Sequence, residues 1–493
     1  MIVKTITNFN GGIAEDPREH KTDSFVTCKG FNSSTKDHTL VPYPETEAET
    51  LSSGDITDKR ISDVIVANDG ILLAIGRNST ATPTTFDLLD KDSSTDISSA
   101  WTSFTSLSGV GGYRKNSLSF YKGSYFVYDE GFNIRKYDGS WSNIGNLSIA
   151  SYWDSMLVPK PFIHPLDDNL YFAVSQSISV LDNTTLTSFS GCPIPTNMFA
   201  SSLTDFGAYL AIACAPAVNG VSRVFLWDRD TTRTTFTENI NWGEGSLLIL
   251  ENVGGILVGI SVSDNSYSTT TQFVTTKNKK LTVRAYTGGT PQVIKELEVS
   301  DTFVLRNIKA QVNGKLYFGG DYDDSLYVVY KDRTGRIVVS KDRFLNNGTA
   351  ITTLRGFNVV GDYLFAMYDT AGSSGLFYRT KVSPSYTSSS TYTTLKNPLM
   401  EVSDRGKKKK LHYVSVGKAS TTGQLVCSVS VDGGSYIAVS TLTASGKLFK
   451  KESRTATGEP FTNGYEFQFK VESTGGAEFT ELKYAYEDIE KNI

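Results

Sequence analysis

Histidine and cysteine, the side chains most used for nucleophilic and metal chemistry, are scarce and scattered in this chain. The four histidines are His20, His38, His164 and His412, and none stands at a metal-ligand spacing from another histidine or a cysteine. No Gly-x-Ser-x-Gly elbow, Walker loop or dinucleotide-binding glycine loop occurs. We therefore expect no catalytic residue and no cofactor.

Acidic residues at alternate positions are better candidates for binding a cation. One stretch carries Asp90, Asp92, Ser94 and Asp96, and a second carries Asp321, Asp323 and Ser325. Calcium takes about six to eight oxygen ligands, but neither stretch has the turn glycine and distal glutamate of an EF-hand. We interpret both as solvated loops, with a metal ion as the alternative. Paired carboxylates for glycoside cleavage cannot be assigned, because the separation of acids is invisible in a sequence.

The most concentrated charge is a basic cluster of Arg405, Lys407, Lys408, Lys409 and Lys410. The favoured interpretation is a solvated strand entrance between domains, and the alternative is a contact with DNA or an acidic neighbour in an assembly. The whole chain has 48 basic and 52 acidic residues and a net charge of −4. This balance argues against a dedicated nucleic-acid binder.

A loose repeat indicates the elements that position these residues. Seven copies of an apolar stretch, a Gly or Asp/Asn turn and a short aromatic-aliphatic strand begin at Val64, Leu118, Ile163, Ser202, Ile249, Ile308 and Phe357. A spacing of ~20–50 residues is typical of solenoids, propellers or arrays. Several copies are followed by another strand signal, such as Val224–Asp228, and sustained helical periodicity is nearly absent. There is room for four short strands per copy, which is the size of a propeller blade.

The predicted fold is all-β: a roughly seven-bladed β-propeller over 51–395, preceded by an extended N-terminal arm over 1–50 and followed by a C-terminal β-sandwich over 396–493. Strand candidates in the last region include Gln424–Val431, and Asp432–Gly434 is a hairpin-type turn. The alternative is a string of β-sandwich domains without the longer period.

The cysteines, the N-terminus and the apolar runs indicate whether the chain carries disulfides, a secretory signal or a membrane span. The cysteines Cys28, Cys192, Cys214 and Cys427 are far apart in strand-like contexts, which favours buried free thiols over a disulfide framework. The N-terminus lacks the pattern of a secretory signal, and no apolar run approaches the ~18–20 residues that span a bilayer. We expect no membrane insertion.

Both ends of the chain carry short patterns that together suggest a family. The first end has Asn8–Gly12, Asp16–Arg18, Cys28 followed by Phe31-Asn32, and Leu40–Tyr43. The other end has Lys407–Lys410 leading into Leu411–Val416, then Val426–Gly434, Gly464–Val471 and Glu481–Glu487. These patterns cover about 150 residues, and they resemble the tail nozzle or tail-hub proteins of short-tailed bacteriophages.

The resemblance implies a non-enzymatic virion tail protein, made in the host cytoplasm. It implies a ring of copies, commonly a hexamer, that lies below the portal and adaptor proteins, contacts other tail proteins and conducts DNA during ejection. A conduit gains from weak DNA binding, because phosphate contacts would retard passage, and a near-neutral chain suits that role.

Two alternatives remain open at this stage. One is a propeller that binds or cleaves glycans during host-surface recognition, with Trp141, Trp153 and Trp242 stacking on sugars. Those tryptophans more often fill blade cores. The other is a cellular interaction propeller. Ser430–Ile437 also resembles the Asp-box of sialidase propellers, with Ile437 where tryptophan is usual, and that box is structural even in sialidases.

Overall fold

The computed structural model describes most of the 493 residues. The described residues are 1–9, 11–14, 24–36, 38–49, 59–67, 71–78, 85–92, 99–108, 117–128, 133–146, 159–174, 176–182, 185–188, 194–216, 220–233, 235–263, 279–332, 334–345, 350–382, 385–386, 389–400, 406–449 and 463–489. All their regular structure is β-strand, and no helix occurs among them.

The chain forms two compact units. The propeller unit comprises Glu47–Asp323 and Thr349–Val382, and the sandwich unit comprises Met1–Thr46, Asp324–Gly348 and Ser383–Ile493. This division assigns β28 and β29, the last two strands of one propeller sheet, to the sandwich unit.

Seven four-stranded antiparallel sheets follow one another along the chain. The first three are β6 (Lys59–Val66), β7 (Ile71–Asn78), β8 (Thr85–Asp92) and β9 (Thr102–Ser108); β10 (Ser117–Tyr121), β11 (Ser124–Tyr128), β12 (Asn133–Tyr137) and β13 (Trp141–Asn146); and β14 (Phe162–Ile163), β15 (Leu170–Val174), β16 (Ser177–Leu181) and β17 (Leu186–Ser188). The next two are β18 (Met198–Phe206), β19 (Tyr209–Pro216), β20 (Val221–Trp227) and β21 (Glu238–Glu244); and β22 (Ser246–Val253), β23 (Ile256–Val262), β24 (Lys280–Tyr286) and β25 (Gln292–Glu298). The last two are β26 (Val304–Val312), β27 (Lys315–Asp321), β28 (Ser325–Lys331) and β29 (Ile337–Phe344); and β30 (Thr353–Val360), β31 (Tyr363–Thr370), β32 (Ser373–Thr380) and β5 (Thr46–Ala48).

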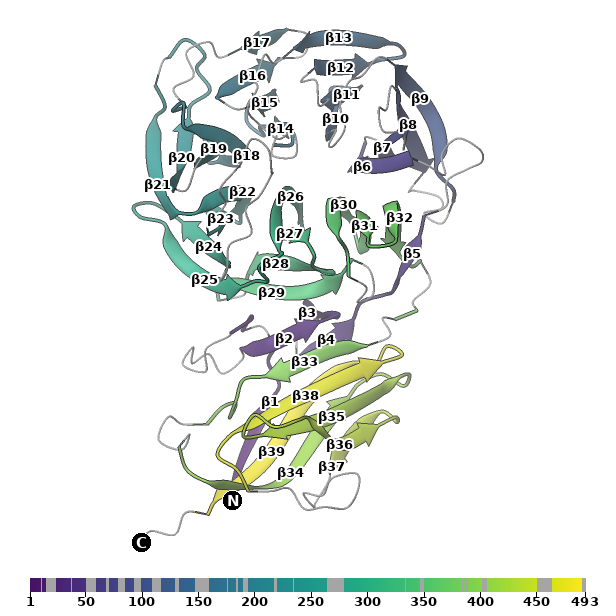
Figure 1. The fold of residues 1–493 in the computed structure, drawn as a ribbon, viewed down its shortest axis with the longest axis vertical. Helices are drawn as coiled ribbons and strands as arrows, with labels where there is room; N and C mark the ends of the chain where they lie inside the picture. Colours follow the sequence, from purple (N-terminus) through teal and green to yellow (C-terminus); the bar gives the residue numbers. More distant parts are fainter. Residues whose placement is uncertain are drawn as a thin grey trace. The chain divides into compact units, whose positions relative to one another are not determined.

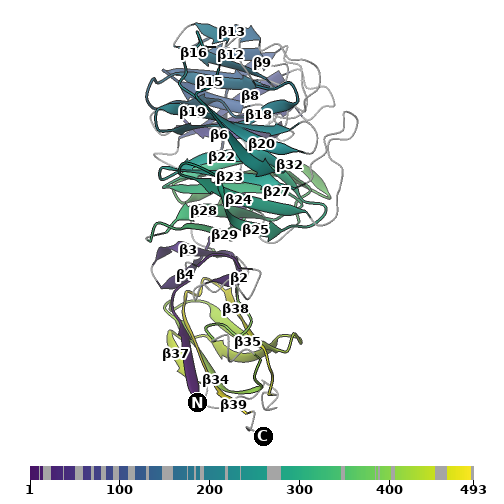
Figure 2. The same cartoon turned by 90° about the vertical axis from the view of Figure 1, so that its left-hand side faces the viewer.

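The seven sheets surround a common centre in chain order, with the first strand of each sheet innermost (Figure 1). Figure 2 shows the same sheets after a turn of 90° about the vertical axis. The expected β-propeller is therefore confirmed, with seven blades. Each of the seven sequence repeats is the inner hairpin of one blade, from β6–β7 to β30–β31.

The local reason for these hairpins is turn chemistry between apolar strands. In the sixth blade, β26 and β27 pair through Val312↔Lys315, and both turn residues have positive φ, 51° at Asn313 and 72° at Gly314. Asn-Gly is the preferred pair for such a two-residue hairpin turn. The flanking strands bury Leu305 and Phe318 in the propeller core.

The propeller ring is closed by β5, a strand that comes from the start of the propeller sequence and completes the last blade. β5 precedes the first blade in sequence but forms the last strand of the seventh sheet, next to β32. Glu49, immediately after β5, has a fully buried side chain that contacts both neighbouring blades. Its carboxylate accepts hydrogen bonds from Lys91 Nζ of β8 and from Trp101 Nε1, each at 2.6 Å, and forms an ion pair with Arg379 of β32.

The sandwich unit contains two sheets. One has the order β3 (Phe31–Lys36), β4 (Thr39–Pro42), β39 (Phe479–Asp488), β34 (Lys409–Lys418) and β37 (Gly446–Phe449), with β1 (Ile2–Ile6) also paired to β39. The other has the order β2 (Phe25–Lys29), β33 (Ser390–Thr394), β38 (Phe467–Thr474), β35 (Gln424–Val431) and β36 (Ile437–Leu442). One apolar core, including Phe31, Val416 and Phe469, joins residues of both sheets, as in a β-sandwich.

The first 46 residues are part of this sandwich unit, whereas the sequence predicts an extended N-terminal arm over residues 1–50. β1 pairs with β39 through Ile2↔Tyr486 to Ile6↔Leu482, and β2 pairs with β33. The ring of Phe9 lies 5.0 Å from that of Phe479, centroid to centroid. The short apolar anchors of the N-terminal segment are thus core residues of the sandwich. In sequence, the propeller is an insertion between β4 and β33.

Two smaller expectations are confirmed in this part of the structure. Asp432 and Gly433 form the turn between β35 and β36, with φ of 52° and 75°, and Asp432 Oδ1 accepts hydrogen bonds from the backbone of Tyr465 and Glu466. Cys28, Cys214 and Cys427 are buried and form no disulfide, and Cys192 lies outside the described residues.

Candidate functional site: the central cavity of the propeller

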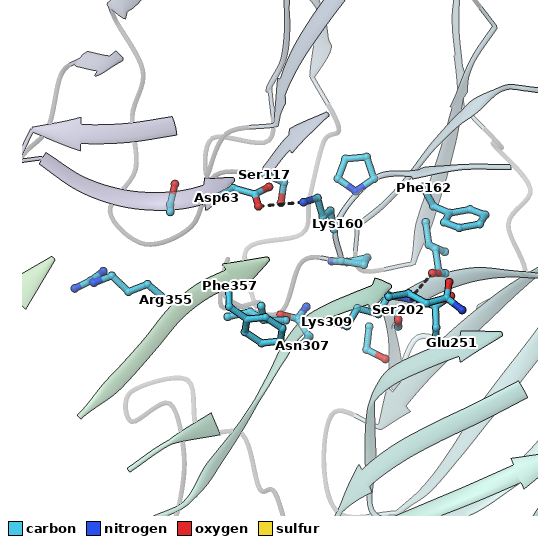
Figure 3. A pocket seen from close by; sticks show the side chains of 18 residues that line it. Asp63, Ser117, Lys160, Phe162, Ser202, Glu251, Asn307, Lys309, Arg355 and Phe357 are labelled. Carbon is cyan, nitrogen blue, oxygen red and sulfur yellow. Dashed lines mark hydrogen bonds and ion pairs between the residues drawn. The ribbon is translucent and has the colours of Figure 1, made fainter. Parts of the chain in front are cut away.

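The inner strands of the propeller converge on a cavity of about 150 Å³ (Figure 3). The polar lining side chains come from six inner strands and from the segment before β14, and they are Ser62, Asp63, Ser117, Lys160, Ser201, Ser202, Glu251, Asn307, Lys309, Gln311 and Arg355. Propeller geometry explains this convergence, because each inner strand contributes only a few side chains to a shared centre.

Asp63 of β6 is the first of two lining carboxylates. Its Oδ1 accepts hydrogen bonds from the Val64 amide at 2.9 Å and from Lys160 Nζ at 3.0 Å, and its Oδ2 accepts from the Leu118 amide at 2.8 Å. The side chain of Lys160 lines the cavity and points toward this carboxylate (Figure 3). Asp63 therefore links the first blade to β10 of the second blade while its charge is balanced.

Glu251 of β22 is the second lining carboxylate, and it is balanced in the same way. Oε2 lies 2.7 Å from Lys309 Nζ, and Oε1 accepts from the Thr204 hydroxyl at 2.8 Å. Lys309 also donates to the carbonyl oxygens of Leu203 at 2.8 Å and Leu250 at 2.5 Å. These three acceptors use all three ammonium protons, so Lys309 joins the fourth, fifth and sixth blades.

Arg355 of β30 is the third lining cation. Its Nε and Nη2 donate to the two carboxylate oxygens of Asp369 at 2.9 and 2.5 Å, which is a bidentate pair. Asp369 also accepts from the Gly375 amide at 2.6 Å. The pair fixes the guanidinium within the seventh blade.

The cavity therefore combines balanced charge with unused hydrogen-bond donors. Each of its three cations faces one carboxylate. Among the described residues, Lys160 Nζ has Asp63 as its one partner, Arg355 Nη1 has none, and the Ser117 hydroxyl has none. Phe162 and Phe357 add ring surface to the lining. Such a site suits a small polar ligand that also presents apolar surface.

The sequence predicts loops for both acidic stretches, but Asp90, Asp92, Asp321 and Ser325 lie on strands. Asp323 lies in the loop between β27 and β28, as predicted. Asp321 is buried, accepts from Arg306 Nε at 2.9 Å and from the Leu354 amide at 2.8 Å, and so links the sixth and seventh blades. Asp90 accepts from the Thr102 hydroxyl, Asp92 ends β8, and Ser94 and Asp96 lie outside the described residues. No cluster of three or more His, Cys, Asp or Glu suited to a metal occurs in the part of the chain that the structure describes.

The basic cluster is split by the alternation of β34. Lys409 is fully buried and donates to the Lys407 carbonyl oxygen at 2.6 Å, so its ammonium group is not available to DNA in this structure. Lys410 is exposed and lies opposite Glu487 of β39, and Lys407 Nζ lies 3.9 Å from Asp488. Arg405 lies outside the described residues, and the role of the remaining lysines stays a prediction.

Trp141 and Trp242, two of the three tryptophans considered for sugar stacking, are not at the cavity. Trp242 is buried in the core between the fourth and fifth blades, and Trp141 is half-buried against the core of the first two blades. Trp153 lies outside the described residues.

His164 is buried in the propeller rather than at the cavity. Arg229 Nη1 donates to its Nδ1 at 2.5 Å, and its Nε2 lies 3.1 Å from the Tyr209 carbonyl oxygen, which assigns the ring proton to Nε2. Burial and the charge of Arg229 hold the pKa of His164 below its usual value.

The cavity residues could not be recognised from the sequence, because each is a single polar residue within or just before an apolar repeat copy. Asp63, Ser117, Ser202, Glu251 and Arg355 all lie on the innermost strand of a blade, before or near the repeat turn. Superposing the seven repeats would have shown a polar side chain recurring in that strand. Their convergence still depends on ring closure, which no single repeat reveals.

No protein-family model matches the chain, and no curated protein matches it. Solved structures similar to it include BamB from Moraxella catarrhalis (12% identity, TM-score 0.42, 69% of this chain and 100% of that chain). An α-L-arabinanase from Penicillium chrysogenum (10%, TM-score 0.36, 69% and 97%) and an exo-β-1,3-galactanase from Phanerochaete chrysosporium (8%, TM-score 0.30, 90% and 100%) are also similar. At these values the likeness indicates no ligand, substrate or partner for this chain. No helix among the described residues has the length and apolarity to cross a membrane.

Proposed function

We propose that this chain is a non-catalytic structural protein of a bacteriophage tail, whose copies form a ring, commonly a hexamer, that conducts DNA during ejection. The observation that carries the proposal is the sandwich unit. The N-terminal and C-terminal patterns that resemble tail nozzle or hub proteins are far apart in sequence but share one hydrophobic core, in which Phe31 and Leu40 pack with Val416 and Val429. Because the two segments fold together into one unit, their separate resemblances to tail proteins support the same conclusion.

The carboxylates of the propeller cavity support a non-catalytic role. Glycoside hydrolysis needs one carboxylic acid that donates a proton and a second carboxylate with an oxygen free to act on water or sugar. Both oxygens of Asp63 and both oxygens of Glu251 already accept hydrogen bonds from the protein. Both carboxylates are thus held in place by donors of the protein, and each faces a lysine ammonium group, as in a structural ion pair.

The charge distribution of the sandwich supports a conduit that does not retain DNA. Phosphate contacts by lysine and arginine dominate non-specific DNA affinity. Here Lys409 is buried, and Lys407 and Lys410 have acidic residues of β39 beside or opposite them. Since the cations that line the propeller cavity are also paired, DNA would pass through a bore between subunits and not through the centre of a propeller.

Electron microscopy of the purified full chain tests the proposal, alone and mixed with the portal and adaptor proteins of the same genome. We expect rings with a central bore, alone or on the portal–adaptor complex. Single particles of monomer size under every mixing condition would refute ring formation. A glycan-directed propeller without tail partners would then be the better account.

A further inference from the structure

We propose that the central cavity of the propeller binds one neutral, polyhydroxylated six-membered ring, such as a single hexose unit. This inference goes beyond ring formation and does not depend on it, because every residue involved belongs to the propeller unit.

The volume of the cavity sets the size of the ligand. An engineered cavity of about 150 Å³ holds benzene, and the propeller cavity has about the same volume. The cavity therefore has room for at most one six-membered ring. A hexose has twice as many non-hydrogen atoms as benzene, so part of it would extend toward the opening, and the second ring of a disaccharide would lie outside. The side chain of Lys160 is 36% exposed and Gln311 is exposed, so the cavity is open to solvent at its lining.

The pairing of charges selects an uncharged ligand. Lys160 faces Asp63, Lys309 faces Glu251, and Arg355 faces Asp369. A bound anion would lie near Asp63 or Glu251, and a bound cation would lie near Lys160 or Lys309. Either would have to displace one partner of a pair, which leaves a buried or half-buried charge uncompensated. A neutral polyol requires no such displacement.

The free polar groups match the hydroxyl groups of such a ligand. The Lys160 ammonium group has three N–H donors, and its bond to Asp63 uses one of them. The Ser117 hydroxyl can donate or accept a hydrogen bond. In Figure 3 both side chains lie beside Asp63 on one wall, and Phe357 lies on the other side of the space with Asn307. A hexose could form hydrogen bonds to Lys160 and Ser117 through its hydroxyl groups. Its ring C–H groups could pack against Phe357 on the other wall.

Saturation-transfer NMR on the full chain tests this site, with the methyl glycosides of glucose, galactose and mannose as neutral probes and glucuronate as the charged probe. A ligand of this size is expected to bind with a dissociation constant on the order of 1 mM. Lys160→Met is expected to weaken binding about ten-fold, and Ser117→Ala about five-fold. Lys280→Met is the matched control, since Lys280 is a half-exposed lysine of β24 that pairs with Glu296 at 3.7 Å away from the cavity.

Transfer from at least one neutral glycoside, reduced in the two cavity variants and unchanged in Lys280→Met, would support the site. The proposal is overturned if no neutral glycoside shows transfer, if both cavity variants bind as the unaltered chain does, or if glucuronate binds more tightly than every neutral probe. Thermal melting of each variant shows whether it is folded, and Ser117→Ala carries the test if Lys160→Met does not fold.

Discussion

Replacing Glu49 with glutamine perturbs the seam where the propeller ring closes. Glutamine has nearly the same shape but no charge, so packing is kept while the ion pairs with Lys91 and Arg379 are lost. Both Glu49 and Lys91 have side chains that are 0% exposed, so the charges left behind cannot be solvated.

The expected loss follows from that burial. Removing one partner of a buried ion pair costs about 3–5 kcal/mol, because the other charge stays buried and uncompensated. Thermal unfolding entropies of about 2.1 cal/mol/K per residue convert this loss into a fall of about 5–8 °C in Tm for a unit of roughly 300 residues. Glu49→Gln is therefore expected to melt several degrees below the unaltered chain.

Differential scanning calorimetry of the full chain, with Glu296→Gln as the matched control, measures this fall. Glu296 is a propeller glutamate whose side chain is 52% exposed and lies 3.7 Å from Lys280. An exposed pair of that kind contributes about 0–1 kcal/mol, so the control should melt within about 1–2 °C of the unaltered chain. Equal melting temperatures for the two variants would refute the idea that Glu49 holds the seam.

Three further outcomes follow from other described residues. The pKa of His164 is lowered in the folded chain, so the unfolded chain binds more protons below a pH of about 6.5; urea midpoints should fall as the pH drops below that value, and less so in His164→Gln. Lys409→Met should lower the free energy of unfolding by about 1–3 kcal/mol, because it removes a buried donor from the Lys407 carbonyl, whereas Lys410→Met at an exposed position should change it by less than about 0.5 kcal/mol in the same urea titration. Burial raises the pKa of Cys427 to about 12, so peptide mapping after iodoacetamide treatment at pH 8 should find it unmodified in the native chain and modified after unfolding.

The blades could be predicted from the sequence because each inner hairpin is a local structure. Strand alternation and turn pairs such as Asn313-Gly314 specify it within about a dozen residues. The same reasoning anticipated β35 residue for residue and the turn at Asp432.

What could not be predicted are the pairings between distant segments. β1 pairs with β39, which lies nearly the whole length of the chain away in sequence, and β5 pairs with β32. The sequences of the short strands β1 and β5 do not indicate which strand each will pair with. The cavity depends on the same long-range closure, since Asp63 and Lys160 meet only after blades have packed side by side. Local periodicity specifies strands, whereas ring closure and sandwich pairing are decided by burial of the whole core.

The mass of the purified full chain in native mass spectrometry tests the central claim, ring formation, most directly. The account predicts a closed assembly of identical 53.9-kDa chains, six in the commonest arrangement, alone or after addition of the portal and adaptor proteins. A mass of one chain under all of these conditions would contradict it.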